Sequence, residues 1–143
     1  MSKETYGITG LAMITAAFLV GLYGILRYSV TGACIYLAGS IAVFLIFVYA
    51  FCAKCPVRNE CVHIVMGMAT LVLPGRSPGI YSRCDLLGTT LFFGFIALFP
   101  QFWLIRDPVL MVIFWILFLG DLAITHYRCC RGCGNTNCPL RYE

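Results

Sequence analysis

Long apolar runs separated by short polar segments dominate the chain. Runs with almost no charge cover residues 7–26, 30–51, 86–105 and 108–126. Each is long enough to cross a hydrocarbon core about 30 Å thick as a helix rising about 1.5 Å per residue. Helices are expected because lipid offers no partners to backbone N–H and C=O groups. The pattern therefore predicts an all-α integral membrane protein with four transmembrane helices in two hairpins.

A fifth apolar run, residues 62–74, is too short to cross a membrane. It is expected to form an interfacial or re-entrant helix, or a buried loop. The chain is thus predicted to divide into a first hairpin with a cysteine group (1–61), a cytoplasmic or interfacial loop (62–84) and a second hairpin with a C-terminal cysteine group (85–143).

Composition agrees with the membrane interpretation. Hydrophobic residues make up 61% of the 143 positions and charged residues 11%, with a mean hydropathy of +0.90. An ordinary soluble domain is roughly half apolar and about a quarter charged. The chain is therefore expected to contact membrane lipid, and its few basic residues give no indication of nucleic-acid binding.

Basic residues predict the orientation of the spans. Four spans put the two termini and the middle loop on one face, and Arg27 and Arg106 on the other. The first face carries most of the basic residues, namely Lys3, Lys54, Arg58, Arg76, Arg83, Arg128, Arg131 and Arg141. Because Lys and Arg concentrate in cytoplasmic loops, both termini are predicted to be cytoplasmic, in a protein of the cytoplasmic (inner) membrane.

All but one of the nine cysteines lie just outside the predicted spans, on the face assigned to the cytoplasm. They form the groups Cys52-x2-Cys55-x5-Cys61 and Cys129-Cys130-x2-Cys133-x4-Cys138, with Cys84 before the third span. The exception, Cys34, falls within the second span and is expected to be a packing residue. Thiols in the cytosol stay reduced, and CxxC spacings among reduced thiols indicate metal or redox chemistry.

The two halves of the chain resemble each other. When Tyr49 is aligned with Tyr127, Cys52 falls on Cys130 and Cys55 on Cys133. A parallel duplication would place the two CxxC turns side by side beneath a four-helix bundle. Chance similarity between two apolar hairpins is the alternative.

The cysteine count favours two iron–sulfur clusters. Two [4Fe–4S] clusters require eight thiolates, and the cytoplasmic cysteines supply them: Cys52, Cys55, Cys61, Cys84, Cys129, Cys130, Cys133 and Cys138. Proline follows Cys55 and Cys138, which is similar to the end of the C-x2-C-x2-C-x3-C-P run of bacterial ferredoxins. One cluster would take Cys52, Cys55 and Cys61, the other Cys130, Cys133 and Cys138, with Cys84 and Cys129 as candidates for the fourth positions.

Several other uses of these thiols remain open. A zinc ion held by Cys52, Cys55, Cys130 and Cys133 would tie two helix ends together, and Cys61 with His63 could add a mixed site. Disulfides would form instead if the cysteines face an oxidising compartment and not the cytosol. Palmitoylated juxtamembrane thiols and a thiol-based carrier of soft metals are further alternatives.

Asp121 is the only acidic or basic residue that lies well inside a predicted span. A carboxylate is costly there and marks a candidate functional site. Asp121, Thr125 and Cys129 are spaced to share a helix face, so Asp121 is a candidate proton relay to a bound quinone. An interfacial carboxylate that faces water is the alternative. His63 and His126 lie near the cytoplasmic surface. No histidine lies near the middle of a predicted span, where it could ligate haem.

These features predict a small electron-transfer subunit, at most the quinone-linked part of an oxidoreductase. The organisation resembles quinol dehydrogenase subunits with four spans and cytoplasmic iron–sulfur ligands. The resemblance implies electron transfer between a cytoplasmic oxidoreductase partner in a larger complex and membrane quinone. A zinc-stapled structural anchor without electron transfer, or a soft-metal transporter, is the alternative.

Overall fold

A computed structural model describes residues 3–57, 69–70, 75–131, 133–139 and 141. Its helices are α1 (Lys3–Leu26), α2 (Val30–Phe47), α4 (Arg83–Leu98), α5 (Gln101–Leu104) and α6 (Pro108–Ile124). Two π-helical turns, η1 (Val48–Cys52) and η3 (Thr125–Cys129), extend α2 and α6. The described residues contain no strand. The apolar run at 62–74 falls outside them except for Ala69 and Thr70, and so do Cys61 and His63.

Four helical segments of the described chain are long and apolar enough to cross a membrane, which confirms the predicted all-α fold with four helices of spanning length. They are Thr5–Leu26, Val30–Cys52, Arg83–Leu104 and Pro108–Cys129. The first helix begins at Lys3, before the apolar run itself, because a helix can continue into polar residues at the membrane surface. The third segment joins α4 and α5.

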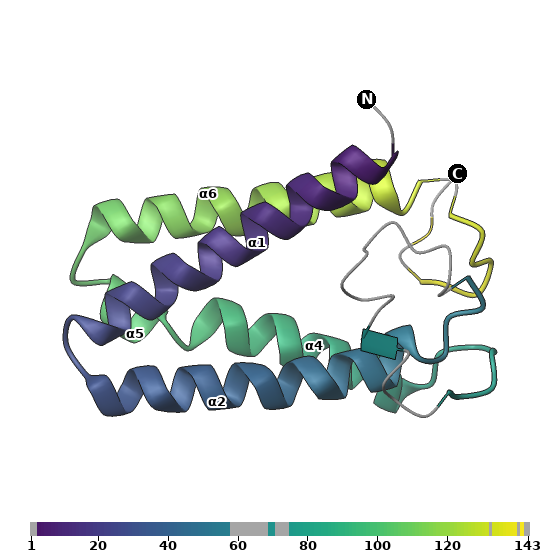
Figure 1. Cartoon of the computed structure of the whole chain (residues 1–143), viewed down its shortest axis with the longest axis horizontal. Helices are drawn as coiled ribbons and strands as arrows, with labels where there is room; N and C mark the ends of the chain where they lie inside the picture. Colours follow the sequence, from purple (N-terminus) through teal and green to yellow (C-terminus); the bar gives the residue numbers. More distant parts are fainter. Residues whose placement is uncertain (1–2, 58–68, 71–74, 132, 140, 142–143) are drawn as a thin grey trace.

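The four segments pack as a bundle (Figure 1). α1 lies along α6, α2 lies along α4, and α1 also contacts α2. Aromatic side chains fill the contact between the pairs, with Phe47, Phe92, Phe114 and Phe118 in one buried cluster. Large aliphatic residues such as Val30 and Ile116 remain exposed on the outside, as expected for a surface that contacts lipid.

The third segment bends at Pro100, and a side chain of α2 donates a hydrogen bond to the backbone carbonyl that the bend leaves unpaired. Proline has no N–H, so it cannot donate to the carbonyl four residues earlier, at Ile96. The hydroxyl of Tyr36 donates to Ile96 O instead, at 3.3 Å. Tyr36 is fully buried and stacks on Phe99 with ring centroids 5.6 Å apart. A break in a membrane helix is thus tolerated because a neighbouring helix supplies the missing donor.

The two hairpins begin their second helices in the same way. The Ser29 side chain accepts a hydrogen bond from Gly32 N at 2.9 Å and caps α2. Asp107 Oδ1 accepts from Leu110 N at 3.3 Å and caps α6. The offset that aligns Cys52 with Cys130 also aligns these two caps. Arg27 Nη1 and Asp107 Oδ2, 2.9 Å apart, join the two hairpin turns.

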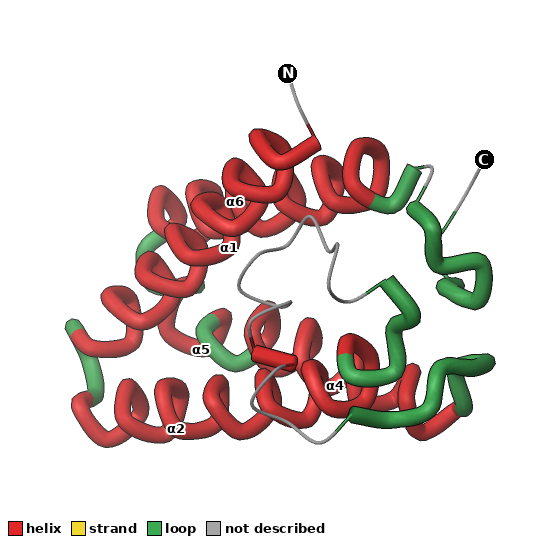
Figure 2. The backbone as a smooth tube through the Cα atoms, turned by 45° about the vertical axis from the view of Figure 1, so that its right-hand side comes forward, coloured by secondary structure: helices red, strands yellow, loops and turns green. Residues whose placement is uncertain are grey.

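The opposite end of the bundle carries the described cysteines other than Cys34. The turns η1 and η3 lead into residues 53–57 and into residues 130–131 and 133–139, and residues 75–82 lie at this end as well (Figure 1). Figure 2 draws the described loops in green. α1 begins at this end too (Figure 1). We call it the cysteine-rich end.

Candidate functional site

Each CxxC turn starts where a π-helical turn ends a long apolar helix: η1 ends on Cys52, and η3 ends one residue before Cys130. Ala53 N donates to Val48 O at 2.8 Å and closes η1, and Cys130 N donates to Thr125 O at 2.9 Å and closes η3. Single π-helical turns are rare and frequently mark functional sites. Their occurrence at the start of both CxxC turns separates these turns from ordinary helix ends.

Each of the two CxxC turns contains the same kind of backbone hydrogen bond. Cys55 N donates to Cys52 O at 3.1 Å, and Cys133 N donates to Cys130 O at 3.2 Å. All four cysteines are half-buried. The aligned sequence positions therefore have the same local structure in the two halves.

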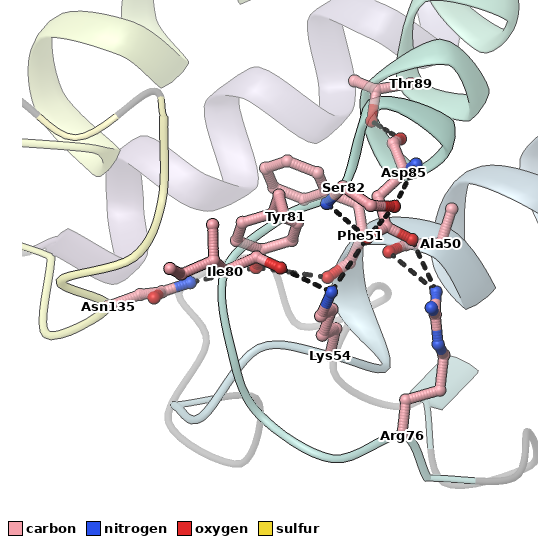
Figure 3. Close-up of polar contacts among 10 residues, drawn as sticks. All are labelled: Ala50, Phe51, Lys54, Arg76, Ile80, Tyr81, Ser82, Asp85, Thr89 and Asn135. Carbon is pink, nitrogen blue, oxygen red and sulfur yellow. Dashed lines mark hydrogen bonds and ion pairs between the residues drawn. The ribbon is translucent and has the colours of Figure 1, made fainter.

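A buried carboxylate holds the first CxxC turn in place (Figure 3). Lys54 lies inside that turn, and its Nζ is 3.0 Å from Asp85 Oδ2 and donates to Ile80 O at 2.6 Å. Arg76 Nη1 is 2.7 Å from Asp85 Oδ1. The Asp85 side chain is 3% exposed, so two cations surround an anion that water barely reaches.

Asp85 also fixes the start of α4. Ser82 N and Ser82 Oγ donate to Asp85 Oδ2 at 2.8 and 2.9 Å, and Asp85 N donates back to Ser82 Oγ. This reciprocal capping box satisfies backbone donors of the first helical turn. Asp85 thus links the start of α4 to the first CxxC turn through Lys54.

A second network connects the two halves. The Tyr81 ring stacks on Phe51 with centroids 4.5 Å apart, and its hydroxyl donates to Phe51 O at 3.3 Å. Asn135 Nδ2, from the C-terminal cysteine loop, donates to Tyr81 Oη at 3.0 Å and to Cys55 Sγ at 3.4 Å. The contact between Asn135 and Cys55 places the C-terminal loop against the first CxxC turn, and Figure 3 shows Asn135 beside Tyr81.

Burial decides the protonation state of the Tyr81 hydroxyl. Burial raises the pKa of Tyr81 well above its usual value, and the hydrogen bond from Asn135 opposes this shift. Negative charge on Cys55, Cys138 or Cys52 would raise the pKa further. The Tyr81 hydroxyl therefore stays protonated.

The other predicted ligands differ in exposure. Cys129 is buried, Cys138 is half-buried, and Cys84 is exposed on the first turn of α4. Cys61 lies outside the described residues. Within the part of the chain that the structure describes, no three His, Cys, Asp or Glu side chains are grouped so that they could hold a metal ion. The described cysteines of both groups share one end of the molecule and form no assembled metal site among themselves.

Asp121 lies between α6 and α1. Its side chain is buried, and Thr125 Oγ1 donates to Asp121 Oδ1 at 3.5 Å. Gly10 of α1 makes room for it, because a Cβ at that position would lie 2.8 Å from Oδ1. The expected proximity of Asp121 and Thr125 is confirmed. Cys129 follows within η3, where the regular α-helical spacing has ended.

Sequence reasoning missed the residues that organise the cysteine-rich end, namely Lys54, Arg76, Tyr81, Asp85 and Asn135. One signal was readable: Ser82-x-x-Asp85 before an apolar run is the pattern of a capping box. The pairing of Asp85 with Lys54 and Arg76 depends on long-range contacts, and so does the position of Asn135.

The chain matches no protein-family model, no curated protein and no solved structure at a level that indicates a relationship. Function therefore has to be inferred from the geometry of the chain itself.

Proposed function

We propose that the protein is a small membrane subunit of a redox complex, with two iron–sulfur clusters at its cysteine-rich end. The observation that carries the proposal is the pair of equivalent CxxC turns, each starting where a π-helical turn ends and closed by the same kind of hydrogen bond. The clusters would pass electrons between a cytoplasmic oxidoreductase partner and membrane quinone. Each would use four thiolates from Cys52, Cys55, Cys61, Cys84, Cys129, Cys130, Cys133 and Cys138.

The distribution of basic residues supports a cytoplasmic position for this end. Lys54, Arg76 and Arg83 lie there, whereas Arg27 and Arg106 flank the hairpin turns at the other end of the bundle. This is the asymmetry expected when the cysteine-rich end faces the cytoplasm. Thiols in that compartment stay reduced and available to metal.

A parallel duplication supports two centres of similar design. The aligned offset relates both helix caps and both CxxC turns, and it relates the packing of α1 on α6 to that of α4 on α2. Two copies of one hairpin unit would then each contribute one cysteine group to a shared end.

Metal binding has to bring the thiols closer together than they are in the structure. The described cysteines are not grouped around a metal position, and Cys61 lies outside the described residues. The networks around Asp85 and Asn135 hold the backbone of the turns near each other. Rotation of cysteine side chains and the addition of Cys61 would then complete a site.

Asp121 is the proposed proton relay to quinone. It is buried within α6, on the path from the middle of the bundle to η3. A buried intramembrane carboxyl next to a hydroxyl can exchange a proton with a reacting group. Replacement of Asp121 by Asn should slow quinone reduction while leaving the visible spectrum of the clusters unchanged.

Reduction and reoxidation of the protein purified anaerobically test the proposed electron transfer. A broad visible absorption should bleach with dithionite and return when a soluble quinone is added. If the protein is coloured but quinone never reoxidises it, the proposed clusters would stand and quinone would be excluded as their electron acceptor. A colourless protein would contradict the proposal.

The alternative is a structural zinc site without electron transfer. The observation that favours it is that Asn135 and Tyr81 already tie the C-terminal loop to the first CxxC turn. A zinc ion bound by four thiolates would strengthen the same connection. Stoichiometric zinc in a colourless protein would support this function instead.

A further inference from the structure

Two short hairpin turns meet at the end of the bundle opposite the cysteines. Residues 27–29 join α1 to α2, and residues 105–107 join α5 to α6, at the same end of the molecule (Figure 1). Arg27 Nη1 and Asp107 Oδ2, 2.9 Å apart, form an ion pair between the turns. Both turns connect helices of spanning length, so in a membrane they lie at its surface.

This end of the bundle carries more positive than negative charge. The charged residues in 23–33 and 99–112 are Arg27, Arg106 and Asp107. Both carboxylate oxygens of Asp107 have partners, since Oδ1 accepts from Leu110 N at 3.3 Å and Oδ2 accepts from Arg27. Among the described residues, no carboxylate pairs with Arg106. The Arg106 guanidinium is therefore left to pair with an anion from outside the described chain.

One aromatic ring lies beside both guanidinium groups. Arg106 Cζ is 5.2 Å and Arg27 Cζ is 6.0 Å from the centre of the Tyr28 ring. Arg106 Cζ is also 5.9 Å from the centre of the Phe102 ring. A guanidinium that stacks on a ring is held in place while its N–H groups remain able to donate to an anion. Both arginines and Tyr28 are exposed, so an anion beside Tyr28 would be close to both cations.

Exposed apolar side chains flank the two arginines along the chain. They come from both hairpins and are each at least half exposed, namely Leu26, Val30, Phe102, Ile105 and Val109. In a membrane such side chains contact hydrocarbon. A ligand that matches this surface combines a negative charge with apolar chains.

The arrangement occurs once in the molecule, although the two hairpins resemble each other. The offset that aligns the CxxC turns aligns Arg27 with Ile105 and Tyr28 with Arg106. The cations therefore stand at different positions of the two turns and meet across the boundary between the hairpins. One surface, with one excess positive charge, is the result.

We propose that this hairpin end binds one anionic phospholipid, whose phosphate pairs with Arg106 and Arg27 and whose acyl chains lie along the exposed apolar side chains of both hairpins. A single negative charge balances the excess positive charge, which a zwitterionic lipid with no net charge does not. A soluble phosphate could use the same guanidinium groups, but it would leave the apolar side chains without a contact. The proposal is independent of metal at the cysteine-rich end.

Native mass spectrometry of the intact protein in a neutral detergent tests the proposal. Phosphatidylglycerol and phosphatidylcholine with the same acyl chains are added in equal amounts, and the retained lipids are counted. Wild type should retain one phosphatidylglycerol in preference to phosphatidylcholine. Arg106→Gln should weaken this preference about fivefold, the contribution expected of one basic residue near an anionic membrane surface. Arg106→Lys keeps the charge and should retain most of the preference.

Arg83→Gln is the matched control and should leave the preference unchanged, because Arg83 is an exposed arginine at the start of α4, at the cysteine-rich end. Equal retention of the two lipids by wild type, or equal losses in Arg106→Gln and Arg83→Gln, would overturn the proposal. Glycerol phosphate, which has the phosphate but no acyl chains, should not displace the lipid. Displacement by it would assign the site to a soluble phosphate and overturn the proposed lipid.

Discussion

At the scale of single residues, one buried carboxylate organises the cysteine-rich end. Asp85 accepts from Lys54, Arg76 and Ser82 and starts α4. The hydrogen bond to Asp85 raises the pKa of Arg76, so the guanidinium remains a cation beside it. Because Lys54 lies between Cys52 and Cys55, the position of the first CxxC turn depends on Asp85.

Replacing Asp85 by Asn should destabilise the protein by about 3 kcal/mol. Removing one partner of a buried ion pair leaves the other charges uncompensated, and here two cations lose their anion. The measurement is thermal unfolding in detergent.

Asp107→Asn is the matched control. It breaks the ion pair with Arg27 at the other end of the bundle, where the side chains are 46% and 26% exposed. Asparagine remains a good N-cap for α6, and an exposed pair contributes about 0–1 kcal/mol. Equal losses in the two variants would show that Asp85 has no special role.

At the scale of elements, the bend at Pro100 depends on a hydroxyl from another helix. Tyr36→Phe should cost about 1–3 kcal/mol, because it leaves Ile96 O unpaired in an apolar interior. Tyr23→Phe removes an exposed hydroxyl of α1 and should change stability by less than about 0.5 kcal/mol. Unfolding in detergent compares the two, and a neutral Tyr36→Phe would mean that another donor satisfies the carbonyl.

Close helix contacts explain part of the glycine content. A Cβ at Gly39 would lie 2.5 Å from Cζ of Phe95, in a ring that stacks on Tyr36, whereas a Cβ at Gly94 would meet nothing within 4 Å. Gly39→Ala should therefore destabilise by about 1–3 kcal/mol. Gly94→Ala should be stabilising by up to about 1 kcal/mol, since alanine favours helix. The same stability change in both variants would contradict the packing of α2 on α4.

At the scale of the whole molecule, the bundle places the cysteine groups at one end and Arg27 and Arg106 at the other. The orientation predicted from basic residues can be tested with fusions. Green fluorescent protein at either terminus should fluoresce, and alkaline phosphatase fused within the 105–107 turn should be active. Active alkaline phosphatase at the C-terminus would contradict the cytoplasmic orientation.

The spans could be predicted from sequence because apolar length alone decides whether a helix can cross a membrane. The bend at Pro100 could be expected from proline chemistry, but its repair by Tyr36 could not, because the two residues are far apart in the chain. The CxxC turns were found from spacing. Their π-helical turns carry no comparable sequence pattern, since 48–52 is apolar and 125–129 is mostly polar.

In the candidate site, too, some features can be predicted from sequence and others arise only on folding. Cysteine identity and spacing are local and were readable. The partners that hold the turns, Asp85 for the first and Asn135 between the halves, are brought together only by folding. Sequence therefore indicated the candidate ligands but not the networks that position them.

The central claim, that the cysteine-rich end binds iron–sulfur clusters, is tested most directly by iron and acid-labile sulfide per chain after anaerobic purification. Wild type should contain both, in the amounts of two four-iron clusters. Cys55→Ser and Cys133→Ser, at aligned positions, should each lose about half, and Cys34→Ser should lose none. Wild type without iron or sulfide, or cysteine variants that all retain the wild-type amounts, would contradict the account.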